Sequence, residues 1–182
     1  GMLDGAEGQP ARFPKDPWAW FEVLPDSRIR LYLSKVEMGQ GVHTSLAQIA
    51  ADELGIAWED LDVVMATTAR DLGDSITSGS SSVSSSYLPL RQAAATLMAM
   101  LRQETAAQMG VAPEQLVVAG RGYAIQGETG QGETGGAGRR DVAAVVQARQ
   151  GDWEAPEQAA ALKDPGQFQY IGQSLPRRDF AA

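Results

Sequence analysis

The chain has 182 residues, of which 43% are apolar, so it is long enough to form one domain with a hydrophobic core. Its formal net charge of −8 and its scattered basic residues argue against a nucleic-acid partner and against an anionic membrane surface. The sequence has no cysteine and one histidine, which excludes disulfides, a thiolate zinc site, a protein-held iron–sulfur cluster and a multi-histidine metal site.

The sequence contains no apolar run long enough for a membrane span, and its N-terminal residues lack the apolar core of a signal peptide. We therefore expect no membrane span, and a cytoplasmic location by default, with a periplasmic location open for a complete enzyme. Residues 1–15 are interpreted as a disordered or tag-derived N-terminus, because a glycine precedes the first methionine. Residues 16–150 are predicted to form the folded domain, and residues 151–182 an irregular C-terminal segment.

The first half of the chain predicts a hairpin followed by a β–helix–β unit. Apolar runs at residues 18–24 and 28–33 flank a turn and predict a β-hairpin with one buried face. Apolar side chains then recur at helical spacing over residues 42–54, and Gly55 is a typical C-terminal stop. The short apolar run 61–65 predicts a buried strand.

A second, longer helix is predicted after a polar loop. The loop lies between Asp71 and Ser86 and carries eight serines, and the helical pattern after it runs to about Met109. Pro89 is compatible with this helix only in the first turn, or else it marks a kink.

The last predicted elements are a hairpin and a short helix. Residues 116–119 and 123–126 predict the hairpin, residues 127–136 a flexible glycine-rich loop tip, and residues 141–149 the helix. This order of elements predicts an α+β fold in two layers, with a mixed β-sheet covered by two main helices.

The most informative stretch is the turn Gly39-Gln40-Gly41, which ends a strand-like run immediately before a helix. Glycines allow a large ligand to approach the backbone, and the N–H groups of a helix start favour oxo or phosphate oxygens. Gln40 adds an amide that can donate and accept hydrogen bonds. The same pattern also fits a plain strand-to-helix connection, and Thr44 occupies the position where a dinucleotide fingerprint needs its third glycine.

The loop residues Thr77, Ser78, Gly79 and Ser80 could form an oxygen-rich cradle, or a solvated linker with a serine cap. Because this loop and the glycine turn each precede a helix, both helix starts could lie at one edge of the sheet, where open α/β arrangements bind ligands. We therefore predict that residues 39–41 and 77–80 share one pocket rim.

Acid–base candidates are weaker. His43 is interpreted as a cap or surface residue rather than a catalytic one. Asp52 and Glu53 are predicted to be a solvated pair near the polar face of the first helix, and Glu37 has no evident partner. No Ser-His-Asp arrangement can be argued. No residue of the chain is predicted to be catalytic or to bind a metal directly.

Several stretches resemble the molybdenum hydroxylases of the xanthine dehydrogenase family, specifically the large subunit of the isoquinoline 1-oxidoreductase and aldehyde dehydrogenase branch. The likeness spans roughly residues 16 to 179 in the family's order. The stretches are Glu37–Thr44 with Ala50–Leu54, Thr77–Ser80 with Ser84, Tyr87–Arg91 with Ala93–Ala95, and Asp164-Pro165, Phe168, Ile171-Gly172 and Leu175–Arg177 with Asp179.

The resemblance implies an oxidoreductase that hydroxylates aldehydes or N-heterocycles at molybdenum held by a pterin, commonly as the cytosine dinucleotide. By analogy, Gln40 would lie near the molybdenum oxo group, and Gly39 and Gly41 would let the pterin approach. Thr77 to Ser80 would contact this molybdopterin cofactor from the other side. The implied partners are the remaining domains of the large subunit and a small iron–sulfur subunit.

The sequence departs from the family at Ser78 and Ala94, where glycine is usual, and at Met98, near which an arginine is frequent. The family's catalytic glutamate also lies in a part of the large subunit that has no match here. We therefore expect the isolated chain to bind no molybdenum and to be inactive. The alternatives are a non-catalytic duplicated domain that acts as an assembly or interaction module, and an independent anion-binding protein. Apolar surface left exposed on a severed domain also predicts self-association.

Overall fold

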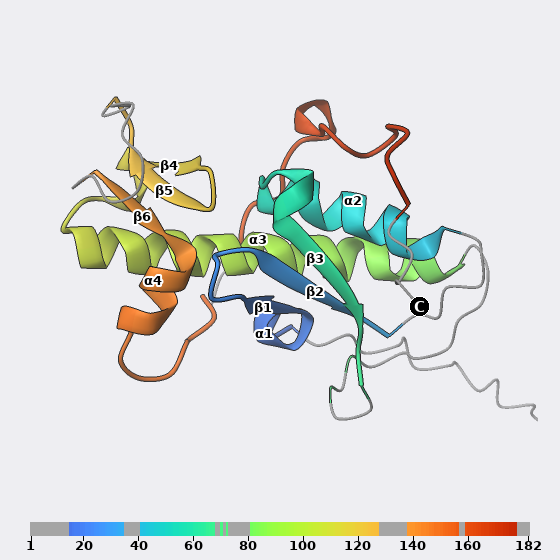
Figure 1. Cartoon of the computed structure of the whole chain (residues 1–182), viewed down its shortest axis with the longest axis horizontal. Coiled ribbons are helices and arrows are strands. Elements are labelled where there is room, and N and C mark those ends of the chain that lie inside the picture. The colour runs from blue at the N-terminus through green and yellow to red at the C-terminus, as the bar shows by residue number, and fades with distance from the viewer. Residues whose placement is uncertain are drawn as a thin grey trace, which may run out of the picture.

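The computed structural model describes residues 15–34, 41–67, 70, 72, 81–127, 138–156 and 159–177. The helices of this part of the chain (Figure 1) are α1 (Pro17–Trp20), α2 (Val42–Leu54), α3 (Ser81–Met109) and α4 (Val142–Ala148). Its strands are β1 (Phe21–Val23), β2 (Ile29–Leu33), β3 (Leu61–Met65), β4 (Leu116–Ala119), β5 (Gly122–Ile125) and β6 (Arg139–Asp141). Short 3-10 turns lie at Trp58–Asp60, Pro113–Gln115 and Pro165–Gln167.

The described strands form two separate three-stranded sheets. In the first sheet, β1 pairs antiparallel with β2, and β2 pairs parallel with β3, with Leu31 opposite Val63. In the second sheet, β4, β5 and β6 are antiparallel. The predicted α+β class and the mixed sheet are confirmed, and the division of the strands into two sheets is new information. The polar strand β6 was not predicted, because its sequence Arg-Arg-Asp shows no alternation.

Helices α2 and α3 form the layer that covers the first sheet. Apolar side chains alternate along β2, with Ile29, Leu31 and Leu33 buried, as the sequence predicts. They share one hydrophobic core with Leu46 of α2 and Leu97 of α3. In Figure 1 the two helices begin at the same end of the molecule and run in the same direction.

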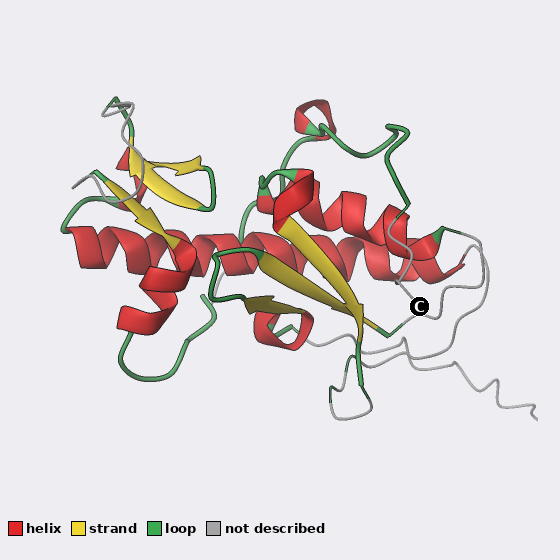
Figure 2. Ribbon diagram, in the orientation of Figure 1, coloured by secondary structure: helices red, strands yellow, loops and turns green. Residues whose placement is uncertain are grey.

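Helix α3 is long enough to reach both sheets, as Figure 2 shows. Near the second sheet, the buried Tyr123 of β5 donates its hydroxyl hydrogen to the Met98 carbonyl of α3 at 2.9 Å. Pro89 lies inside α3, beyond its first turn, which excludes the first of the two predicted alternatives and leaves the kink as a prediction. Gly110 follows the helix with φ 69°, a left-handed conformation that suits glycine.

The predicted first hairpin needs one correction, because residues 18–20 are helical rather than extended. The Asp16 side chain accepts a hydrogen bond from the Trp18 N–H at 3.0 Å, and Pro17 occupies the first helical turn. An acidic cap followed by proline is a helix start signal that the apolar run concealed.

Residues 159–177 return from the second sheet and run along α2 (Figure 1). Apart from the turn Pro165–Gln167, their backbone is irregular. Within the described ranges, no helix is both long enough and apolar enough to cross a membrane.

Candidate functional site

Gly41 is the one predicted cofactor-binding residue that the structure describes. Gly39, Gln40, Thr77, Ser78, Gly79 and Ser80 lie outside the described residues, as does Glu37. Gly41 is the N-cap of α2 and has the left-handed angles φ 74° and ψ 21°, which favour glycine. Among the described residues, a Cβ added to Gly41 would meet no other atom within 4 Å, so there is room beside this Cα.

The electrostatics of the helix starts favour an anionic ligand. The Ser45 N–H donates to the Gly41 carbonyl at 3.0 Å, which closes the first turn of α2. Glycine has no side chain to cap the helix, and neither α2 nor α3 carries an acidic residue in its first turn. The partial positive charge at each helix start is therefore not neutralised by a carboxylate within that turn.

The two helix starts lie at the same level. The buried ion pair between Glu53 of α2 and Arg91 of α3, 2.8 Å long, fixes which turns of the two helices are adjacent. Val42 precedes Glu53 by 11 residues (53 − 42), and Ser81 precedes Arg91 by 10 residues (91 − 81). Since the helices run in the same direction and each residue rises about 1.5 Å, the two starts lie within about one helical turn of each other along the axes.

This arrangement supports the expectation that the two segments preceding the helices approach one another. That residues 39–41 and 77–80 share a pocket rim stays a prediction, because six of these residues lie outside the described ranges.

Three side chains that were expected at the surface are buried. His43 has no exposed area, so its interpretation as a cap or surface residue is wrong. Asp52 and Glu53 are 3% and 4% exposed, so they are not a solvated pair. For Asp52 and Glu53 the cause is the segment 159–177, which covers this face of α2 and donates hydrogen bonds to both carboxylates. No local pattern in the sequence announces this contact, because the partners are more than 100 residues apart.

Two of the three positions that depart from the family pattern have structural roles here, while Ser78 lies outside the described residues. Ala94 is fully buried in the hydrophobic core. Met98 accepts the Tyr123 hydroxyl hydrogen through its carbonyl, and its sulfur lies 3.8 Å from the same hydroxyl.

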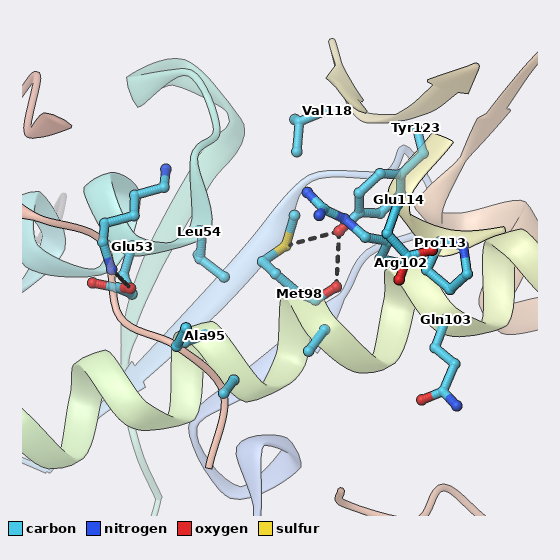
Figure 3. A pocket seen from close by; sticks show the side chains of 14 residues that line it. Glu53, Leu54, Ala95, Met98, Arg102, Gln103, Pro113, Glu114, Val118 and Tyr123 are labelled. Atoms are coloured by element: carbon cyan, nitrogen blue, oxygen red, sulfur yellow. Dashed lines mark hydrogen bonds between the residues drawn. The ribbon is translucent and has the colours of Figure 1, made fainter. Parts of the chain in front are cut away.

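A cavity of about 460 Å³ lies between the C-terminal end of α2, the middle of α3 and the β4–β5 hairpin (Figure 3). Its floor is apolar, with Leu54, Ala95 and Met98, and its cationic side chains are Arg102 and Lys163. Burial lowers the pKa of Lys163, although the nearby Glu53 and Asp52 oppose this effect. None of the described residues that line this cavity is a predicted site residue, and the cavity lies at the opposite end of α2 from Gly41.

No group of three or more histidine, aspartate or glutamate side chains within the described ranges is placed to hold a metal ion. The elements that the structure offers near Gly41 are the starts of α2 and α3.

Comparison with known proteins identifies the family. A family model of the molybdopterin cofactor-binding domain matches residues 2–173, and the chain therefore belongs to this family. This confirms the resemblance seen in the sequence.

Similar proteins are much longer than this chain. One of the subunits of nicotinate dehydrogenase from Pseudomonas putida is 31% identical over 158 residues, which are 86% of this chain and 12% of that protein. The membrane-bound aldehyde dehydrogenase [pyrroloquinoline-quinone] of Gluconacetobacter polyoxogenes is 33% identical over 104 residues, 57% of this chain and 14% of that protein. The beta subunit of isoquinoline 1-oxidoreductase from Brevundimonas diminuta is 29% identical over 120 residues, 62% of this chain and 15% of that protein.

The fold is also similar to that of a solved structure. Quinoline 2-oxidoreductase from Pseudomonas putida 86 superposes with a TM-score of 0.54 at 23% identity, covering 80% of this chain and 18% of that one. The α+β fold is therefore that of a domain within a larger protein chain.

Proposed function

We propose that this chain is the cofactor-binding domain of a larger molybdenum-dependent oxidoreductase that hydroxylates aldehydes or N-heterocycles. Membership of the molybdopterin cofactor-binding family supports the cofactor class. The names of the relatives support the substrate class, since nicotinate and isoquinoline are N-heterocycles and a third relative acts on an aldehyde. The observation that carries the proposal is the pair of helix starts that lie at the same end of the molecule and carry no acidic side chain in their first turns.

The residues near the helix starts have the chemistry that an anionic, already chelated metal cofactor requires. Gly39 and Gly41 would let it approach the backbone, and the N–H groups at the start of α2 would face its negative charge. Gln40 would donate or accept through its amide. Thr77, Ser78, Gly79 and Ser80 would contact it from the start of α3. When bound, the molybdenum pterin supplies the redox chemistry, and the role of this chain is to hold and orient it.

The cytosine dinucleotide form of the cofactor is part of the proposal. A dinucleotide is longer than the pterin alone and carries a pyrophosphate, which suits two adjacent helix starts that lack acidic side chains in their first turns.

We further propose that the partners are the remaining domains of a large subunit and a small iron–sulfur subunit, and that the chain alone is inactive. This chain matches 12% of the nicotinate dehydrogenase relative, so most of such a protein lies outside the matched region. In the proposed assembly, the base for the reaction and the path for electrons come from these partners. Self-association of the chain by itself stays a prediction.

The test compares the 182-residue chain with a longer polypeptide that contains it together with its partner subunits. Molybdenum is measured by elemental analysis, and the nucleotide released by acid hydrolysis is identified by mass spectrometry. We expect equimolar molybdenum and released cytidine monophosphate from the longer polypeptide only, with dye reduction by an aldehyde or an N-heterocycle. A longer polypeptide without molybdenum or pterin would contradict the proposal, and another nucleotide would contradict the cytosine form alone.

A further inference from the structure

The segment 159–177, here called the clamp segment, contacts both helices whose starts form the candidate site. It runs along α2 in Figure 1, and three charged side chains are buried where it meets the helices. These are Asp52 and Glu53 of α2 and Arg91 of α3, which are 3%, 4% and 7% exposed. Buried charges of this kind persist only when they are fully paired, so their partners show what the clamp segment does.

Asp52 holds the clamp segment through its backbone. Its Oδ1 accepts hydrogen bonds from the Gln169 N–H at 2.7 Å and the Tyr170 N–H at 3.1 Å, and its Oδ2 accepts one from the Ile171 N–H at 2.8 Å. Three consecutive N–H groups thus surround one carboxylate. Because the acceptor is charged, each bond is stronger than a neutral one. Gln48, one turn earlier on α2, adds bonds from its Nε2 to the Tyr170 and Gln173 carbonyls, both at 2.8 Å.

Glu53 and Arg91 join the two helices through the backbone of Lys163. Arg91 Nε donates to Glu53 Oε2 at 2.8 Å, and the Lys163 N–H donates to Glu53 Oε1 at 2.8 Å. Arg91 Nη2 donates to the Lys163 carbonyl at 2.5 Å. The Arg91 guanidinium also lies 5.3 Å from the Tyr87 ring and 5.0 Å from the Phe168 ring. A lysine could not reproduce this set, since it lacks the planar fork of donors.

Alanines form part of the buried faces of the two helices, with Ala47, Ala50 and Ala51 on α2 and Ala93 and Ala94 on α3, beside larger side chains such as Leu46 and Leu90. Helices specify their relative position through ridges of side chains that fit into grooves, and alanine makes shallow ridges. A buried ion pair, by contrast, is well suited to selecting one register among several.

We infer that the clamp segment, through the positioning residues Asp52, Glu53 and Arg91, sets the register of α2 against α3 and thereby the spacing of the two helix starts. The effect of the clamp segment on the helix register does not depend on the proposed function, whereas its consequence for the cofactor rests on that function. A slip of one helical turn would displace one start from the other by about 5.4 Å, which would separate the two loops that we assign to the cofactor.

The register can be measured in the 182-residue chain, because its lack of cysteine allows paired spin labels at Thr44→Cys and Leu88→Cys. The test variant is Glu53→Met with Arg91→Met, since apolar side chains of similar volume often preserve stability when they replace a buried ion pair. The matched control is Arg30→Met with Asp62→Met, which removes a 2.6 Å ion pair between β2 and β3. Thermal unfolding verifies that each variant folds.

We expect a narrow interlabel distance distribution in the parent and in the control, and a broadened distribution or one shifted by about 5 Å in the test variant. A distribution in the folded test variant that equals the parent's would overturn the inference. Should the double variant not fold, Arg91→Lys provides the same test, because it keeps the charge but cannot bridge Glu53 and Lys163.

The consequence for the cofactor is tested in the longer polypeptide with its partners. We expect the test variant to lose molybdenum cofactor affinity by about ten-fold, as for changes in the outer shell of other metal sites, and the control to retain it. Full cofactor content despite a lost register would show that the clamp segment does not position the cofactor. A parent that holds no cofactor would refute the proposed function, while the distance measurement would still decide the register.

Discussion

At the scale of single residues, the largest departure from the sequence interpretation concerns acidic side chains of α2. Asp52 and Glu53 occupy helix positions that fit a solvated pair, yet both are buried. Their environment is created by Lys163 and by the backbone of residues 169–171, which no helical periodicity can reveal. Each oxygen of these two carboxylates accepts a hydrogen bond from the clamp segment or from Arg91. An acidic residue in a mostly apolar helix is therefore a candidate for a distant contact.

Asp52→Asn is expected to lower the free energy of unfolding by about 3 kcal/mol, because the amide loses the negative charge and presents N–H donors to backbone N–H donors. Asp62→Asn is the control, since Asp62 pairs with Arg30 in a half-buried site and should change stability by less than about 1 kcal/mol. Urea unfolding measures both. Equal losses in the two variants would show that the contacts of Asp52 with the clamp segment add no special stability.

The buried hydroxyl of Tyr123 leads us to expect that the stability of the fold depends on pH. Burial raises the pKa of its hydroxyl well above the ordinary value of 10.0. The folded state therefore disfavours the phenolate, and the stability from neutral Tyr123 is fully present below pH 10 and is lost as the pH rises towards the raised pKa. As the pH rises from about 9.5 to 11, the melting temperature of the parent should fall more steeply than that of Tyr123→Phe. Parallel pH profiles would contradict this assignment.

At the scale of elements, the periodic segments were predictable and the short or polar ones were not. Helices α2 and α3 and strands β2, β3, β4 and β5 have clear apolar patterns, and Gly55 and Gly110 mark helix ends with φ near 69°. The four-residue helix α1 was hidden in an apolar run, and β6 has only polar residues. The division of the described strands into two sheets leaves no local signal in the sequence.

Gly122→Ala tests the close packing of the second sheet. A Cβ at Gly122 would lie 2.1 Å from the Arg140 carbonyl oxygen of β6, so the two strands would have to separate. We expect a loss of at least about 2 kcal/mol in unfolding free energy, as is common for overpacking. The control is Gly166→Ala, where an added Cβ would meet no atom within 4 Å. Chemical denaturation compares the two, and a neutral Gly122→Ala would contradict the described β5–β6 pairing.

At the scale of the whole molecule, helix α3 connects the two sheets and the clamp segment. It packs against α2 over the first sheet, reaches the second sheet through Tyr123, and meets the clamp segment through Arg91. The Gly39–Gly41 turn and the serine-rich loop were recognisable as ligand-binding candidates from composition and from the family resemblance. That the two segments approach one another stays a prediction. The relative position of the helices that follow them could not be derived from the sequence, because a third, distant segment contacts both helices.

The central claim is that the molybdopterin cofactor lies against the starts of α2 and α3. It is tested most directly by Gly41→Ala in the longer polypeptide, compared with Gly110→Ala. Both glycines have positive φ at a helix end, 74° and 69°, and an added Cβ meets no atom within 4 Å at either, so the backbone strain is similar. Gly41 lies at the start of α2, whereas Gly110 lies beyond the far end of α3.

The measurement is the molybdenum and pterin content of the two purified variants at equal thermal stability. The account predicts about a ten-fold loss of cofactor affinity for Gly41→Ala and none for Gly110→Ala. Equal cofactor content in the two variants would contradict it.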